Sequence, residues 1–345
     1  MLRQNLFLET FPDAPRYRQG QFFEAFFEPQ YQSFEDVTTL SKTLRLELSQ
    51  YIPWMTLTRR HVTASQTKDT FKALLETEDH QMIETVLMKN SRGFWSVCVS
   101  SQVGCAMACT FCATGKMGFT RNLTADEIID QYRFWMYYLA RDISLEQRIS
   151  NIVYMGMGEP LANYENVKLS LQLLLQYTDM GPTRLTVSTV GLIPALEKLL
   201  TDPEWPPVRL AVSLHSADSE TRKNIMPSSY DSFLEKLTEW TKKYFEKFDT
   251  RRRHLTFEYV MLSGVNDTEM HAKKLIQFSH TIGKVRINLI PYNDTKSKYA
   301  TSESRPLLDF EAHLQKAGLD VTRRKTKGAD IAAACGQLAT LNKIS

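Results

Sequence analysis

The stretch Cys98-Val-Ser-Ser-Gln-Val-Gly-Cys105-Ala-Met-Ala-Cys109-Thr-Phe-Cys112 decides how the rest of the chain is organised. Its last three cysteines have the spacing Cys-x3-Cys-x2-Cys. Three thiolates can bind three irons of a [4Fe–4S] cube and leave the fourth iron open for another ligand. The spacing therefore predicts an iron–sulfur site at Cys105, Cys109 and Cys112.

Other interpretations of these cysteines stay open at this point. A structural zinc site usually has four ligands in two paired knuckles, and the sequence has no second knuckle. Disulfides form in oxidising compartments, and the sequence has no secretory signal. The remaining cysteines, Cys98 and Cys335, are each, taken alone, more typical of small buried side chains than of catalysts.

The length and composition fit a large globular protein. The 345 residues can form one large α/β domain and a smaller one, and 43% of them are hydrophobic, which is ample for a core. The sequence has no run of about 18 apolar residues, so we expect no membrane span. A cytoplasmic location is expected, because it suits an oxygen-sensitive cluster and free thiols.

The charge pattern is weakly basic. The net charge is +3 and the sequence pI about 8.4, which alone does not establish nucleic-acid binding. Basic residues gather at Arg59-Arg60-His61, Arg251-Arg252-Arg253-His254 and Arg323-Arg324-Lys325-Thr-Lys327. Each cluster can contact phosphates, but a solvated face is the favoured interpretation of any one taken alone.

We expect three segments along the chain. They are an N-terminal helical, RNA-binding accessory domain over residues 1–75, a small β extension or linker over 76–97, and the main domain over 98–345. In the first segment, apolar residues recur at helical spacing over 17–27 and 37–51.

Short β-rich runs alternate with helical segments after the cluster loop. Strands are predicted at residues 71–76, 82–88, 152–155, 184–188, 208–213, 255–260 and 285–290, and helices at 125–139, 163–176, 233–248 and 269–278. The last five strands and the one that ends near Ser100 make six βα units, which imply a parallel sheet with right-handed crossovers. The predicted fold is therefore α/β, a partial (β/α)6 barrel.

Polar residues follow these strands, where a barrel places its chemistry. They include Gly158, Glu159, Ser188, Ser213, His215, Asn266, Asp267 and Asn293. Any one of them fits an ordinary turn, because glycine, asparagine, aspartate and serine are common turn residues. Together, on the same rim as the cluster loop, they indicate a cup that binds a ligand.

The chain resembles the RlmN/Cfr-type radical-SAM RNA adenine methyltransferases. The likeness extends from Pro15 to Leu338 and is strongest in residues 98–123, 156–163, 188–194, 213–215, 264–267, 288–293 and 328–338. Two features are particular marks of this family. They are the segment around Cys335 and a cysteine, Cys98, seven residues before the cluster motif.

The resemblance implies roles for individual residues. Cys105, Cys109 and Cys112 would bind the [4Fe–4S] cluster. Gly158, Glu159, Ser188, Ser213, Leu214, His215 and Asn293 would bind S-adenosylmethionine. The catalytic residues would be Cys335 as methyl carrier, Cys98 as resolving thiol and Glu84 as candidate proton acceptor.

The resemblance also implies a reaction that uses two molecules of S-adenosylmethionine per turnover. One methylates Cys335, and the other is cleaved at the cluster to a radical that takes hydrogen from this methyl group. The carbon then adds to adenine and links protein to RNA. Cys98 releases the product by forming a disulfide with Cys335. An electron donor such as flavodoxin or ferredoxin would serve a monomeric enzyme.

Details of the motifs separate the branches of the family. Gly158-Glu159-Pro160 and Ile290-Pro291-Tyr-Asn293 resemble the branch that methylates C2 of adenine. The expected targets are then an adenosine in the peptidyl-transferase region of 23S rRNA and, secondarily, the adenosine 3′ of the tRNA anticodon. Three alternatives stay open: C8 methylation as in the Cfr resistance branch, a radical-SAM enzyme for another substrate, and a non-catalytic, metal-stabilised RNA-binding module.

Overall fold

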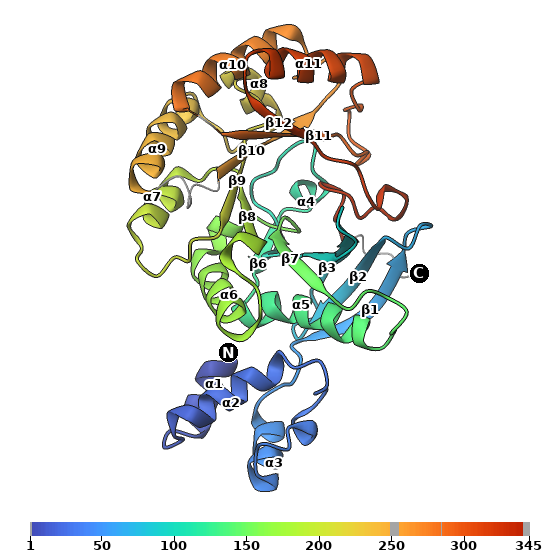
Figure 1. The fold of residues 1–345 in the computed structure, drawn as a ribbon, viewed down its shortest axis with the longest axis vertical. Helices are drawn as coiled ribbons and strands as arrows, with labels where there is room; N and C mark the ends of the chain where they lie inside the picture. The colour runs from blue at the N-terminus through green and yellow to red at the C-terminus, as the bar shows by residue number, and fades with distance from the viewer. Residues whose placement is uncertain (1, 249–254, 284, 341–345) are drawn as a thin grey trace.

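The computed structural model describes residues 2–248, 255–283 and 285–340 (Figure 1). A ten-stranded sheet forms its centre. In spatial order its strands are β1 (Leu57–Ala64), β2 (Thr70–Thr77), β3 (Met82–Lys89), β4 (Trp95–Cys98), β7 (Ile149–Tyr154), β8 (Leu185–Thr189), β9 (Arg209–Ser213), β10 (Leu255–Met261), β11 (Arg286–Pro291) and β12 (Asp320–Arg323).

The sheet has an antiparallel part and a parallel part. Strands β1 to β4 pair antiparallel, and β4 to β12 pair parallel. All six predicted βα strands are present, so the partial barrel is confirmed. A further strand that was not predicted, β12, is short and largely exposed and extends the parallel part beyond β11.

Helices cover the outside of the parallel strands (Figure 1). Buried apolar side chains from both layers, such as Trp240 of α9 and Phe257 of β10, form one continuous core. The helices are α5 (Ala125–Ala140), α6 (Tyr164–Tyr177), α7 (Ile193–Thr201), α8 (Ser219–Ile225), α9 (Phe233–Lys247), α10 (Glu269–Ile282) and α11 (Ser304–Lys316). No helix within the described residues is long and apolar enough to cross a membrane.

The N-terminal helices form a lobe next to α5 (Figure 1). They are α1 (Arg3–Thr10), α2 (Arg16–Phe26) and α3 (Lys42–Tyr51). In this N-terminal part, helical structure ends at Tyr51, well before residue 75, and the segment 57–64 pairs with β2 as strand β1. Of the three basic clusters, Arg59-Arg60-His61 lies on β1, and Arg251-Arg252-Arg253-His254 lies outside the described residues.

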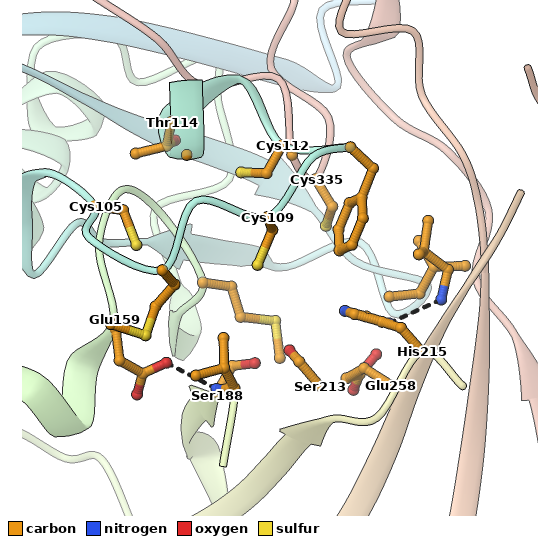
Figure 2. A pocket seen from close by; sticks show the side chains of 18 of the residues that line it. Cys105, Cys109, Cys112, Thr114, Glu159, Ser188, Ser213, His215, Glu258 and Cys335 are labelled. Carbon is orange, nitrogen blue, oxygen red and sulfur yellow. Dashed lines mark hydrogen bonds between the residues drawn. The ribbon is translucent and has the colours of Figure 1, made fainter. Parts of the chain in front are cut away.

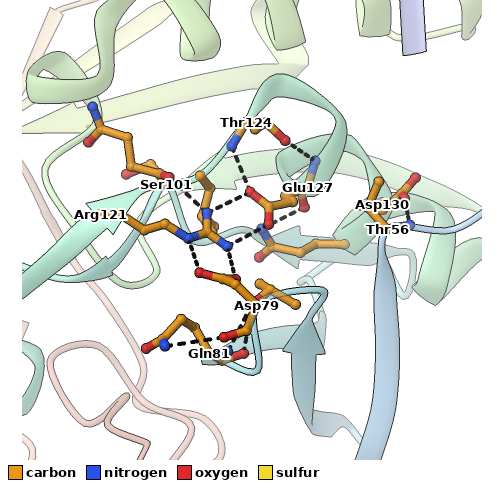
Figure 3. A network of polar contacts seen from close by, with 12 residues as sticks. Thr56, Asp79, Gln81, Ser101, Arg121, Thr124, Glu127 and Asp130 are labelled. Carbon is orange, nitrogen blue, oxygen red and sulfur yellow. Dashed lines mark hydrogen bonds and ion pairs between the residues drawn. The ribbon is translucent and has the colours of Figure 1, made fainter. Parts of the chain in front are cut away.

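A network of ion pairs anchors the segment that follows the cluster loop (Figure 3). The short hairpin of β5 (Gln102–Gly104) and β6 (Phe119–Asn122) flanks this loop, which contains the short helix α4 (Ala113–Lys116). From β6, Arg121 donates to Asp79 at 2.5 and 2.8 Å and to Glu127 of α5 at 2.8 and 2.9 Å. The guanidinium thus ties the hairpin to the β2–β3 turn and to α5.

The segment 324–340 runs from β12, at one edge of the sheet, to the antiparallel strands β2 and β3. It leaves β12 and reaches the antiparallel strands, where Lys72 of β2 donates to the Ala332 carbonyl at 3.2 Å. The Ala339 amide donates to the Glu84 carboxylate of β3 at 2.9 Å. This C-terminal segment therefore carries Cys335 across the open side of the barrel.

Candidate active site

A large cavity lies at the carboxyl ends of the parallel strands (Figure 2). About 1080 Å³ of space lies among its lining residues, a figure that includes space open to solvent. The cluster loop forms one wall, the strand ends form another, and the C-terminal segment contributes Cys335, Gly336 and Leu338.

The three cysteines of the predicted cluster motif all line this cavity. A tight loop holds them: the Cys105 amide donates to the Gly118 carbonyl at 2.7 Å, and the Cys112 amide donates to the Cys109 carbonyl at 3.1 Å. A Cβ atom on Gly115 would lie 2.9 Å from the Cys109 backbone nitrogen, so this close turn requires glycine.

The chemistry of these thiols fits an iron–sulfur cluster. Burial raises the pKa of Cys105 to about 11 and also raises that of Cys109. Thiolates here are therefore unfavourable without a bound cation to compensate their charge. Within the described residues, no three cysteine, histidine or acidic side chains are grouped around one ion position. A cube does not need such a grouping, because each thiolate binds a different iron.

Glu159 is held rigidly at the opposite wall of the cavity (Figure 2). Its carboxylate accepts from the Val190 amide at 2.7 Å and from the Leu161 amide at 3.0 Å. The preceding Gly158 has φ of 99°, and a Cβ atom there would lie 2.5 Å from the Gln102 side chain. Glycine therefore lets the chain turn sharply and present Glu159 to the cavity.

We expect the affinity for S-adenosylmethionine to rise between pH 5.5 and 7. Burial raises the pKa of Glu159 to about 7, so the carboxyl is mainly protonated at the lower pH. In its predicted role as a ligand of S-adenosylmethionine, Glu159 would attract the positive charge of the cofactor only as the ionised carboxylate. Equilibrium dialysis of the cluster-loaded protein measures this dependence.

Glu159→Gln should bind S-adenosylmethionine about tenfold more weakly or worse and lose the pH dependence. An unchanged pH profile in this variant would contradict the assignment.

His215 is a neutral imidazole at the end of β9. It is 5% exposed, and burial together with the Arg222 charge lowers its pKa to about 3. Its Nδ1 accepts from the Val260 amide at 3.0 Å, so the proton is on Nε2. Figure 2 shows the ring's other nitrogen directed into the cavity, where it can donate a hydrogen bond to a ligand.

The predicted cofactor residues fall into two groups. Gly158, Glu159, Ser188, Ser213 and His215 line the cavity. Leu214 and Asn293 do not line it. The Leu214 amide donates to the Glu258 carbonyl at 3.0 Å, and the Asn293 side chain donates to the Cys335 carbonyl at 3.2 Å. Asn293 therefore holds the loop that carries Cys335.

Cys98 and Cys335, from distant parts of the chain, influence one another electrostatically. Cys335 is exposed and lines the cavity, whereas Cys98 is buried at the end of β4. Burial and the neighbouring Cys335 thiol raise the pKa of Cys98 to about 12. Both are free thiols in this structure, so a disulfide is not present. This electrostatic influence counts against the non-catalytic module, which predicts that the two cysteines are far apart.

Glu84 lies on β3, behind the C-terminal segment and outside the cavity lining. It forms an ion pair with Lys72 at 2.8 Å and accepts from the Ala339 amide at 2.9 Å. Burial raises the pKa of Glu84, and Lys72 opposes this rise. The carboxylate is thus already engaged by the chain, and reaching a substrate requires the segment near Ala339 to move.

Sequence reasoning missed two charged residues of the cavity, Glu258 and Arg324. Glu258 lies within the predicted strand 255–260. The sequence pattern of a strand does not show that a charged side chain in it faces a cavity. In the sheet it lies between Ser213 of β9 and Asn288 of β11. Arg324 belongs to a basic cluster interpreted as a solvated face. Arg324 reaches the cavity because β12, which precedes it, pairs parallel with β11.

The cluster loop, the cavity and the partial barrel define a radical S-adenosylmethionine enzyme. In agreement, the family model of the Radical SAM superfamily matches residues 99–276. A crystal structure of a radical SAM methyltransferase from Sphaerobacter thermophilus matches with a TM-score of 0.89 and 37% identity, over 98% of this chain and 97% of that one.

The relatives define the family more narrowly. A dual-specificity RNA methyltransferase RlmN from Ruthia magnifica is 40% identical, over 94% of this chain and 89% of the relative. Probable RlmN enzymes from Chlorobium phaeobacteroides and Aquifex aeolicus are 39% and 37% identical, each over 94% of this chain and over 90% and 91% of the relative. The chain belongs to the RlmN family of radical SAM methyltransferases. The predicted cofactors, a [4Fe–4S] cluster and S-adenosylmethionine, are confirmed by this membership.

Proposed function

We propose that this protein methylates C2 of an adenosine in 23S rRNA and of the adenosine 3′ of the tRNA anticodon. The observation that carries the proposal is the placement of Cys335 in the same cavity as the three cluster cysteines. Cys98, at the end of β4, is under the electrostatic influence of Cys335. An RNA substrate and dual specificity agree with the names of the relatives.

The two thiols, Cys335 and Cys98, offer a route around the low nucleophilicity of the adenine carbon. The adenine carbon is a poor nucleophile, so a simple displacement at the methyl group of S-adenosylmethionine cannot methylate it. When bound, the cluster supplies the electron that cleaves S-adenosylmethionine. Cys335 first takes a methyl group as a thiolate and later joins its carbon to the base. Cys98 then attacks the Cys335 sulfur and releases the product, which accounts for the pairing of the two thiols. We keep Glu84 as the candidate proton acceptor, acting after the C-terminal segment moves.

The roles of the remaining parts are proposals of the same kind. The cavity lies at the barrel rim, so the target adenosine must be unstacked or flipped to enter it. We assign RNA binding to the N-terminal segment 1–75, a linking role to 76–97 and the chemistry to 98–345. The enzyme would act as a cytoplasmic monomer with a flavodoxin or ferredoxin as electron donor.

The test is a methylation assay with the cluster reconstituted under anaerobic conditions. The protein is incubated with a reductant, methyl-labelled S-adenosylmethionine and either a 23S rRNA fragment or tRNA, and the digested RNA is analysed by mass spectrometry. We expect 2-methyladenosine in both RNAs. Cys335→Ala, which should keep its cluster, serves as the control without a methyl carrier and should give none.

Other outcomes of this assay are equally informative. Formation of 8-methyladenosine would keep the mechanism and move the protein to the other branch of the family. Methylation of only one RNA would remove dual specificity. Failure to methylate either RNA, despite an intact cluster and cleaved cofactor, would overturn the proposed substrate.

A further inference from the structure

The carboxylate of Glu258 has one engaged and one free oxygen. Its Oε1 accepts from the Asn288 side chain at 2.8 Å and from Arg324 at 3.3 Å. Thr322 donates to the Asn288 amide oxygen, which orients the nitrogen of this amide toward Glu258. Glu258 is only 3% exposed, and its Oε2 is buried without a hydrogen-bond partner among the described residues. Such an orphaned oxygen is unfavourable, and a ligand in the cavity can supply the missing donor.

The surroundings of Glu258 in the cavity are both polar and apolar. Parallel pairing places Glu258 of β10 directly beside Ser213 of β9, and both residues line the cavity (Figure 2). Val260 lies two residues later on the same face of β10 and lines the cavity together with Tyr292. The lining around Glu258 therefore combines a carboxylate, a hydroxyl and apolar side chains.

This combination distinguishes among the donors of S-adenosylmethionine, which are its ammonium group, its two ribose hydroxyls and the amino group of its adenine. The ammonium group is already assigned to Glu159, after β7, three strands away from β10 in the sheet. The apolar side chains suit the flat adenine ring. A carboxylate beside the hydroxyl of Ser213 suits two neighbouring hydroxyls, because the carboxylate only accepts hydrogen bonds and the serine can both donate and accept.

We propose that Glu258 is a further cofactor-binding residue, whose Oε2 accepts a hydrogen bond from a ribose hydroxyl of S-adenosylmethionine. Arg324 and Asn288 act through Glu258, because they hold its other oxygen and so fix the direction of the free one. The inference rests on the predicted cofactor site and not on the RNA substrate, since it concerns only the binding of the cofactor.

The test is equilibrium dialysis of the cluster-loaded protein at pH 8, without RNA. The ligands are S-adenosylmethionine and its 2′-deoxy and 3′-deoxy analogues. We expect the wild type to bind at least one analogue about tenfold more weakly, because the hydrogen bond to a charged acceptor is lost. Glu258→Gln keeps an oxygen for Arg324 and Asn288 and places an NH₂ group where Oε2 lies. It should bind S-adenosylmethionine about tenfold more weakly and discriminate against that analogue by no more than about twofold.

A carboxylate elsewhere in the sheet provides the matched control. Asp320 of β12 is exposed, pairs with Arg286 at 2.9 Å and does not line the cavity, so Asp320→Asn should bind all three ligands as the wild type does.

Two results would overturn the proposal. The first is a wild type that binds both analogues as tightly as S-adenosylmethionine, a result that does not depend on how any variant folds. The second is normal cofactor binding by Glu258→Gln with slower RNA methylation, which would assign the free oxygen to the target base instead. The expected losses of binding in a protein that methylates no RNA would leave the role of Glu258 standing and reject the proposed substrate alone.

Discussion

Replacing Cys98 by alanine is expected to stop the reaction at a covalent complex between protein and RNA. Cys98 is a buried thiol on which Cys335 acts electrostatically, and the other three cysteines are the predicted ligands of the cluster. Without attack by Cys98 on the Cys335 sulfur, the bond between Cys335 and the methylated base persists. The variant should methylate Cys335 normally, while multiple-turnover RNA methylation falls by more than about 100-fold. A denaturing gel with labelled RNA measures the complex.

Two controls make the result specific. Ser96→Ala changes a half-buried side chain on the same strand, β4, and should turn over like the wild type. The double variant Cys98→Ala/Cys335→Ala should form no complex, because it has no methyl carrier. Wild-type turnover by Cys98→Ala would show that another group resolves the intermediate, and the pairing of the two thiols would then need another explanation.

Sequence patterns predicted the parts of the site that depend on local structure. The cysteine spacing identified the cluster loop, and the polar residues after β7, β8 and β9 line the cavity with it. This succeeded because the carboxyl ends of parallel strands meet at one rim. At the end of β10 the same rule gave Asn266, which instead fixes the loop: its side chain donates to the His215 and Val260 carbonyls, each at 2.7 Å.

The missed residues depend on contacts between distant parts of the chain. Arg324 enters the cavity only because β12 pairs with β11, and its partner Glu258 is 66 residues away. Glu84 likewise accepts a hydrogen bond from the Ala339 amide, a contact that spans 255 residues. No periodicity within a short window carries information on such contacts, so local patterns cannot predict them.

Asp130 is the buried centre of a network that joins the N-terminal lobe to the barrel. On α5, its carboxylate pairs with Arg3 of α1 and with Arg133 at 2.5 Å, and it accepts from the Thr56 amide at 2.6 Å. Burial opposes ionisation, but the two arginines outweigh it and lower the pKa of Asp130 to about 2. The stabilisation is therefore present above the unfolded-state pKa of about 4 and is lost as the pH falls toward 2.

We expect Asp130→Ala to lower the free energy of unfolding by about 3–5 kcal/mol, because it leaves two buried guanidinium groups without their shared partner. Urea unfolding at pH 7, followed by circular dichroism, measures the change. Asp142→Ala removes an exposed carboxylate and should change stability by no more than about 0.5 kcal/mol. Arg133→Met/Asp130→Leu removes both charges of one pair, leaves Arg3 paired with Asp126 at 3.3 Å, and should recover part of the loss. An equal effect of Asp130→Ala and Asp142→Ala would mean that the lobe is held by its apolar contacts alone.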